Sequence, residues 1–266
     1  MLGKLVKYDL KAAAKIFILI HAVYMFICFA ARFLYMDSLN FAELSEPLIF
    51  SLILFISLMT LLVSALSIIT WLQVAFRFYR NLFSKEGYLS WTLPVSGPQH
   101  LWAKIISGYI LMAADLIIIA AGILLLVTGS NVTTAYGMIA DELTAELGFS
   151  LSTLSLILFA VCLVSCISSV IMIYFSVVVG QLFPSHRVLG AVAAYFITSF
   201  IVQIISVIIM FVLGFLPGYN TALLDGKAMM DHMFRLLTLS SVLMLVITVA
   251  QYIASHYIMK KKINLQ

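Results

Sequence analysis

The sequence predicts an all-α, polytopic integral membrane protein with six transmembrane helices, both termini in the cytoplasm and an amphipathic helix before the first span. Of the 266 residues, 64% are hydrophobic and 10% are charged. Soluble domains average about 45–50% apolar and about 25% charged residues, so the chain is too poor in charge for a soluble fold. The few charges separate six long apolar intervals, and most basic residues fall on one side of them.

Each of the six intervals is long enough for a helix that crosses the hydrocarbon core, which takes about 20 apolar residues. The five prolines lie at or outside the ends of these intervals, as expected because proline removes a backbone hydrogen bond that lipid cannot replace. The strands of a β-barrel would be ~10-residue stretches of alternating polarity, which the chain lacks. The predicted spans are residues 16–36, 48–76, 105–128, 150–175, 189–214 and 236–259.

The basic residues predict the orientation, since short cytoplasmic loops collect lysine and arginine. Segments 1–15, 77–104 and 260–266, together with Arg187, hold 12 of the 15 basic residues, so we expect them in the cytoplasm. The formal net charge of +4 then reflects topology. A nucleic-acid partner is not expected, because that would need one clustered basic face.

The first segment, residues 1–15, is predicted to be a cytoplasmic amphipathic helix in the headgroup layer, because its four lysines form one stripe. Asp9 falls on the opposite, apolar side. It either faces a protein partner or is a snorkelled or solvated acid.

The second interval is up to 30 residues long, about 45 Å as a helix, which exceeds a ~30 Å core and predicts a helix that projects into the cytoplasm. It leads into segment 77–104, the longest cytoplasmic connection. The aromatic residues of this segment form either an interfacial belt or a short helix that docks on a partner. In the second interpretation Tyr88, Trp91 and Leu93 are the apolar anchors and Glu86 is the charged contact.

No phosphate-binding loop, zinc-binding helix or nucleophile elbow occurs in the sequence, and the predicted loops are too short for a catalytic domain. We therefore expect a transport subunit and no enzyme activity in this chain. The alternatives are a secondary transporter or membrane substrate-binding component, and an intramembrane enzyme.

Two segments resemble the permease subunits of type-2 ABC exporters. The segment before the first span, with its lysines and Tyr8-Asp9, is similar to their amino-terminal elbow helix, and segment 77–104 is similar to their first cytoplasmic loop. Where the family usually has threonine after the glycine of this loop, the chain has Tyr88. The loop residues that carry the resemblance are Glu86-Gly87, Leu89, Leu93-Pro94-Val95-Ser96 and Lys104.

The resemblance implies a subunit that lacks an ATP site and receives motion from a cytoplasmic ABC ATPase, which would hold ATP and magnesium. The chain itself would need no cofactor. It would pair with a second permease subunit, identical or different, in the lipid bilayer of a bacterial plasma membrane, and move an amphipathic or hydrophobic solute outward. The ATPase-coupling residues would be Glu86, Tyr88, Trp91, Leu93, Pro94 and Asp9.

Asp115 is the one acidic residue inside a predicted span, where a charge costs at least ~2.5 kcal/mol. We therefore expect it to face the protein interior or to be protonated. It either contacts solute or protons on a translocation pathway, or makes a structural hydrogen bond. No metal site is predicted.

Overall fold

The computed structural model describes residues 2–41, 45–84, 87, 92, 97–215 and 226–261. Within these ranges the chain is helical and has no strand, which confirms the predicted fold class. Six helices are long and apolar enough to cross a membrane, and each predicted span falls on one of them. The long helices are α1 (Leu2–Leu34), α2 (Glu46–Phe83), α4 (Gly97–Val127), α6 (Leu151–Gly180), α7 (Arg187–Val212) and α8 (Gly226–Lys261).

The helix boundaries follow local sequence signals. Pro47 and Pro98 lie in the first turns of α2 and α4, where a missing backbone N–H costs nothing. Ser150 caps α6, because its side chain accepts a hydrogen bond from the Thr153 backbone N–H at 3.2 Å. Pro184 separates α6 from α7.

The helix α1 is continuous from Leu2 to Leu34, so the predicted amphipathic segment and the first span share one run of helical backbone. A short 3-10 helix, η1 (Met36–Ser38), follows it. The helix α2 extends to Phe83, seven residues beyond the predicted span 48–76. Its 38 residues would measure about 57 Å, longer than a ~30 Å core.

The helix α5 (Ser130–Leu147) lies between the third and fourth spans, where the sequence predicts only a loop. It has no buried residue and ends at Gly148, whose φ of 78° is a left-handed conformation that favours glycine. Because α5 lacks a long apolar run, its sequence does not predict a membrane span.

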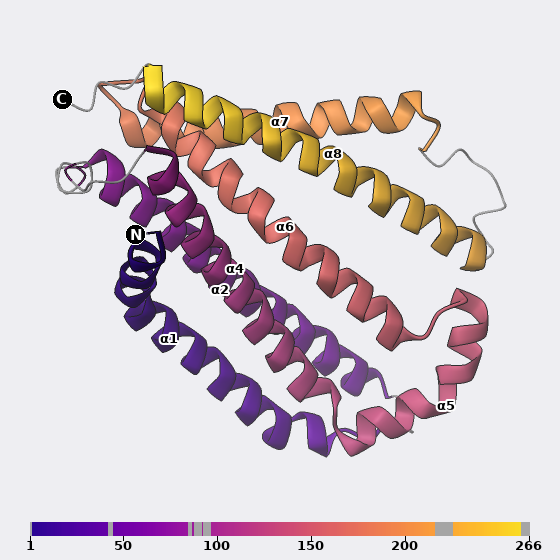
Figure 1. The fold of residues 1–266 in the computed structure, drawn as a ribbon. Coiled ribbons are helices and arrows are strands. Elements are labelled where there is room, and N and C mark those ends of the chain that lie inside the picture. Colours follow the sequence, from indigo (N-terminus) through magenta and orange to yellow (C-terminus); the bar gives the residue numbers. More distant parts are fainter. Residues whose placement is uncertain are drawn as a thin grey trace.

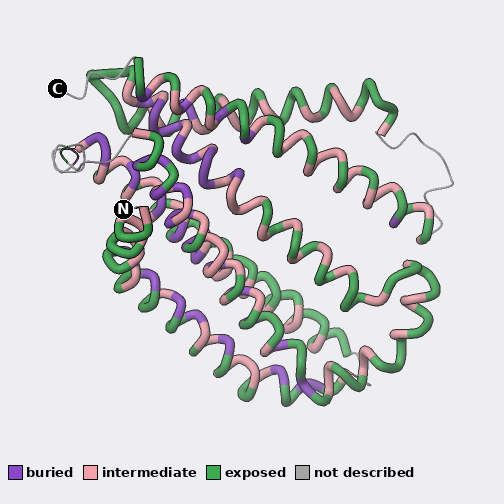
Figure 2. The backbone as a smooth tube through the Cα atoms, viewed as in Figure 1, coloured by how far each residue is buried: buried purple, intermediate pink, exposed green. Residues whose placement is uncertain are grey.

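The start of α1 and the end of α8 lie at the same end of the bundle, with α5 at the opposite end (Figure 1). The helix α1 packs along α4, α4 packs on α6, and α6 packs on α7 and α8. Figure 2 shows that buried residues lie mainly toward the end with the termini, whereas α7 is largely exposed. Its exposed side chains are mostly apolar, as expected for a helix in contact with lipid.

Candidate functional site

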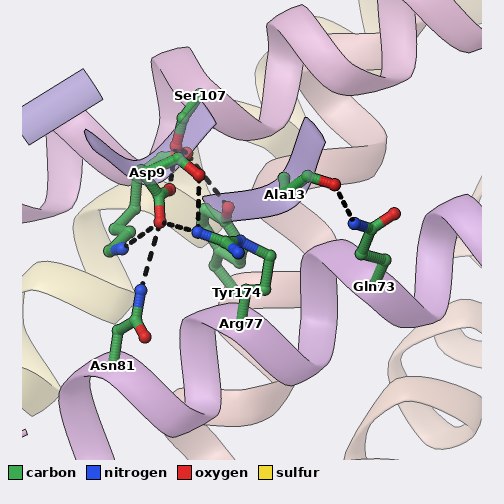
Figure 3. A network of polar contacts seen from close by, with 8 residues as sticks. Asp9, Ala13, Gln73, Arg77, Asn81, Ser107 and Tyr174 are labelled. Atoms are coloured by element: carbon green, nitrogen blue, oxygen red, sulfur yellow. Dashed lines mark hydrogen bonds and ion pairs between the residues drawn. The ribbon is translucent and has the colours of Figure 1, made fainter. Parts of the chain in front are cut away.

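Two polar clusters lie inside the bundle. The first, the Asp9 cluster, is near the end that carries the termini and joins α1, α2 and α4 (Figure 3). It consists of Asp9, Arg77, Asn81, Lys104 and Ser107. The second, the Asp115 cluster, lies halfway along the same three helices. It consists of His21, Ser67, Thr70 and Asp115.

The Asp9 carboxylate accepts hydrogen bonds from four side chains. Oδ1 accepts from Arg77 Nη2 at 2.6 Å, from Lys104 Nζ at 2.7 Å and from Asn81 Nδ2 at 3.1 Å. Oδ2 accepts from the Ser107 hydroxyl at 2.5 Å. Such charge-assisted bonds are the strong ones among protein hydrogen bonds. They fix the start of α1 to the end of α2 and the start of α4.

The charges of this cluster are nearly removed from solvent, since the side chains of Asp9, Lys104 and Arg77 are 8%, 13% and 17% exposed. Asp9 and Lys104 precede the predicted spans 16–36 and 105–128. Burial alone would raise the pKa of Asp9, but the Lys104 ammonium, the hydrogen bonds from Lys104 and Ser107, and the Arg77 guanidinium together hold it below its usual value. The cluster therefore keeps Asp9 ionised.

Neighbouring contacts extend this junction. Gln73 on α2 donates to the Ala13 backbone carbonyl at 2.9 Å, one turn along α1 from Asp9. The Tyr174 hydroxyl on α6 donates to the Lys104 carbonyl at 3.0 Å, and its ring stacks on Phe78 of α2 at 3.9 Å between centroids. Four helices thus meet within two turns of Asp9.

This placement differs from both expectations for Asp9, a carboxylate that faces a protein partner or one that is snorkelled or solvated. Its oxygens point to α2 and α4, and the four donors leave little of the group exposed. Considered on α1 alone, Asp9 sits on an apolar face. In the bundle, that face is the one covered by α2 and α4.

The other predicted coupling residues, Glu86, Tyr88, Trp91, Leu93 and Pro94, lie outside the described residues. The structure does place the helices that flank them. Since α2 ends at Phe83 and α4 begins at Gly97, the segment between these helices is shorter than the predicted loop 77–104.

The Asp115 cluster lies where the sequence predicts, in the protein interior. The side chain of Asp115 is 7% exposed, and its Oδ1 is 2.8 Å from His21 Nε2. Thr70 donates to Oδ1 at 2.8 Å and Ser67 donates to Oδ2 at 3.3 Å. Asp115 therefore bonds to α1 through His21 and to α2 through two hydroxyls.

The positions of both clusters follow from one register between α1 and α4, which run parallel. Side-chain hydrogen bonds join residues that are 94 or 95 positions apart, from Asp9 on α1 to Met36 in η1. These pairs are Asp9 with Lys104, His21 with Asp115, Tyr24 with Ile119, and Met36 with Asn131 at the start of α5.

A glycine makes this close packing possible. A Cβ atom on Gly122 would lie 2.5 Å from the Tyr24 hydroxyl oxygen, so the hydrogen at this position lets the Tyr24 ring approach α4.

The sequence interpretation missed His21, Ser67 and Thr70 as partners of Asp115. Hydropathy places each residue in a span but carries no information on which spans pack together. The available signal was that His21 and Asp115 are both strongly polar residues within apolar spans, and such residues pair with one another.

Comparisons with protein-family models, curated proteins and solved structures give no match to this chain. No group of three or more metal-ligating side chains occurs in the described ranges.

Proposed function

We propose that the chain is the membrane-spanning subunit of an ATP-driven exporter of the type-2 ABC class. A separate cytoplasmic ATPase would bind ATP and magnesium and act on the segment between α2 and α4. A second permease subunit, identical or different, would complete the pathway for an amphipathic or hydrophobic solute such as a drug, peptide or lipid-like molecule. The proposed location is a bacterial plasma membrane.

The Asp9 cluster is the observation that supports this proposal most directly. Arg77 and Asn81 lie near the end of α2, Lys104 and Ser107 lie near the start of α4, and all four bind one carboxylate of α1. Both helices that flank the proposed coupling segment are thus fixed to a third helix. A force applied to that segment would move α1, α2 and α4 together, as a coupling element requires.

The length of α2 supports the same proposal. The helix continues for six residues, about 9 Å, beyond Arg77, which belongs to the Asp9 cluster at the end of the bundle that carries the start of α1. The coupling segment would then be held away from the headgroups, where a cytoplasmic ATPase can contact it.

Copurification tests the proposal in native membranes. Single variants Glu86→Ala and Trp91→Ala are purified by a tag on the chain, and the ATP hydrolysis that copurifies is measured. We expect both variants to lose most of the associated ATPase while the chain itself stays folded. Phe211→Ala, on α7, is the control because Phe211 is an aromatic residue that is 71% exposed and lies outside segment 77–104. Retention of the ATPase and of ATP-dependent transport by both test variants would contradict the proposal.

The Asp115 cluster favours a second candidate function, a secondary transporter driven by an ion gradient. Ionisable residues that face the interior of a membrane domain often belong to proton or ion pathways. This candidate requires transport or solute binding by the chain without an ATPase. Reconstitution of the chain alone into vesicles, with an imposed proton gradient, separates the two functions.

A further inference from the structure

We propose that His21 and Asp115 form a proton-binding site inside the membrane domain, in which one bound proton joins α1 to α4. The inference goes beyond the exporter function and does not depend on it. It follows from the hydrogen-bonding requirements of the two ring nitrogens of His21.

The first ring nitrogen has a fixed role. His21 Nδ1 is 2.7 Å from the Phe17 backbone carbonyl oxygen. A carbonyl oxygen only accepts hydrogen bonds, so Nδ1 must carry a hydrogen. The Phe17 ring stacks on the imidazole at 3.9 Å between centroids, which holds the ring in this orientation.

The second ring nitrogen needs one shared proton. His21 Nε2 is 2.8 Å from Asp115 Oδ1, and a contact this short requires a hydrogen between the two atoms. With Nδ1 already protonated, the pair is either a neutral imidazole with a protonated Asp115 or an imidazolium with a carboxylate. Both forms hold the same number of protons and have no net charge.

Loss of this proton changes the contact between α1 and α4. The lone pair of Nε2 would then face a carboxylate oxygen, and the two acceptors would repel each other in a site of low dielectric. Thr70 and Ser67 would continue to donate to the carboxylate from α2. Deprotonation would therefore leave Asp115 bound to α2 and remove its bond to α1.

The site lies near the middle of the membrane domain. Along α1, His21 is 12 residues from Asp9 and 11 residues from Arg32, which forms an ion pair with Asp37. At 1.5 Å per residue, each charged cluster is about 17 Å from His21, so the two clusters bracket a slab close to a ~30 Å hydrocarbon core.

The remaining ionisable groups around the pair are weakly acidic. Tyr24 on α1 and Cys166 on α6 are within electrostatic range of Asp115, and Cys28 is adjacent to Tyr24. From α2 only the hydroxyls of Ser67 and Thr70 reach the carboxylate, and in the described part of the chain no lysine or arginine forms an ion pair with it. A proton shared with His21 is thus the available compensation for the charge of Asp115.

Nitrogen-15 NMR of the full-length chain tests the proposal. The protein is labelled with 15N-histidine, placed in lipid nanodiscs and titrated from acid to alkaline pH, and the His21 signals are assigned as those missing from His21→Gln. We expect Nδ1 to stay protonated throughout and Nε2 to lose one proton in a single step.

Two variants should move this step in opposite directions. Asp115→Asn removes the carboxylate that stabilises the proton, so the step should move to lower pH. Thr70→Val removes a donor that stabilises the carboxylate, so the step should move to higher pH. The proposal is wrong if Nδ1 is the nitrogen that titrates, or if the step has the same pH in the wild type and Thr70→Val. The second criterion holds even if Asp115→Asn does not fold.

The rate of cysteine labelling measures the change in contact between α1 and α4. Cys28 is fully buried on α1, whereas Cys162 on α6 is exposed. Above the pH of the step, the labelling rate of Cys28 by a membrane-permeant maleimide should rise relative to that of Cys162. The ratio should stay constant in Asp115→Asn, because the asparagine side chain can bond to Nε2 in either protonation state: its carbonyl oxygen accepts from Nε2–H, and its amide donates to the deprotonated nitrogen. An unchanged ratio in the wild type would overturn the proposed link between the proton and the α1–α4 contact.

Discussion

Replacement of Asp9 by alanine should destabilise the chain more than replacement of any exposed acidic residue. Asp9→Ala removes the one acceptor that Arg77 and Lys104 share and leaves two cations in a site that is largely shielded from solvent. At 2.6 and 2.7 Å and an effective dielectric constant of ~20, each pair contributes about 6 kcal/mol of Coulomb attraction. Desolvation of the ions offsets several kcal/mol of this, so we expect a net loss of about 3–5 kcal/mol.

The chain contains a matched control. Asp37 forms one ion pair, with Arg32 at 2.7 Å, and its side chain is 37% exposed. Ion pairs in contact with water contribute about 0–1 kcal/mol, so Asp37→Ala should have a small effect. The two variants thus compare a buried carboxylate that has four donors with a partly exposed one that has a single ion pair.

The assay is reversible unfolding of the purified chain in mixed micelles, followed by circular dichroism and by tryptophan fluorescence. Coincidence of the two probes establishes that the transition is two-state. If Asp9→Ala and Asp37→Ala lowered the free energy of unfolding by the same small amount, the reasoning on the Asp9 cluster would be refuted.

Three further predictions use the same preparation. Gly122→Ala should lower the free energy of unfolding by about 1–3 kcal/mol, because the added Cβ would meet the Tyr24 ring on α1. Gly137→Ala, on exposed α5, is the control: its Cβ has open space, so the variant should raise helix stability by up to about 1 kcal/mol. Tyr174→Phe should cost about 1 kcal/mol for one lost hydrogen bond, and Tyr174→Ala about 3–5 kcal/mol, since it also removes a buried ring; equal losses would contradict the role given to the ring. At neutral pH a membrane-permeant maleimide should label Cys162 and leave buried Cys28 unlabelled until the chain is unfolded; rapid labelling of both in the folded chain would contradict the packing of α1 on α4.

The six spans were predictable because each is a long interval with few charges, a property of the local sequence. The helix α5 was not, because its residues alternate between apolar and polar character and none is buried. The interior position of Asp115 was also predictable, from the cost of a charge in lipid alone.

The partners of the two aspartates could not be predicted, because they depend on which helices pack together and in which register. His21 bonds to Asp115, which is 94 residues later in the chain, and Asp9 bonds to Lys104, which is 95 residues later. Neither distance is encoded in the hydropathy of α1 or α4. If α1 and α4 were known to be neighbours, both contacts could be predicted. The register would be the one that places each aspartate of one helix opposite a lysine or histidine of the other at the same separation.

The constant separation of about 95 residues between α1 and its partners on α4 also affects how the chain is made. At 5–20 residues per second, synthesis reaches the partner of each α1 residue about 5–20 seconds after that residue. During this interval α1 has α2 as a neighbour, through Gln73 and Arg77, but lacks α4. His21 therefore enters the membrane before its partner on α4 exists, whereas Asp115 enters when its partners on α1 and α2 are already present. Of the two residues, Asp115 has the higher free-energy cost of insertion into lipid, and its later position in the chain means that it enters the membrane after His21.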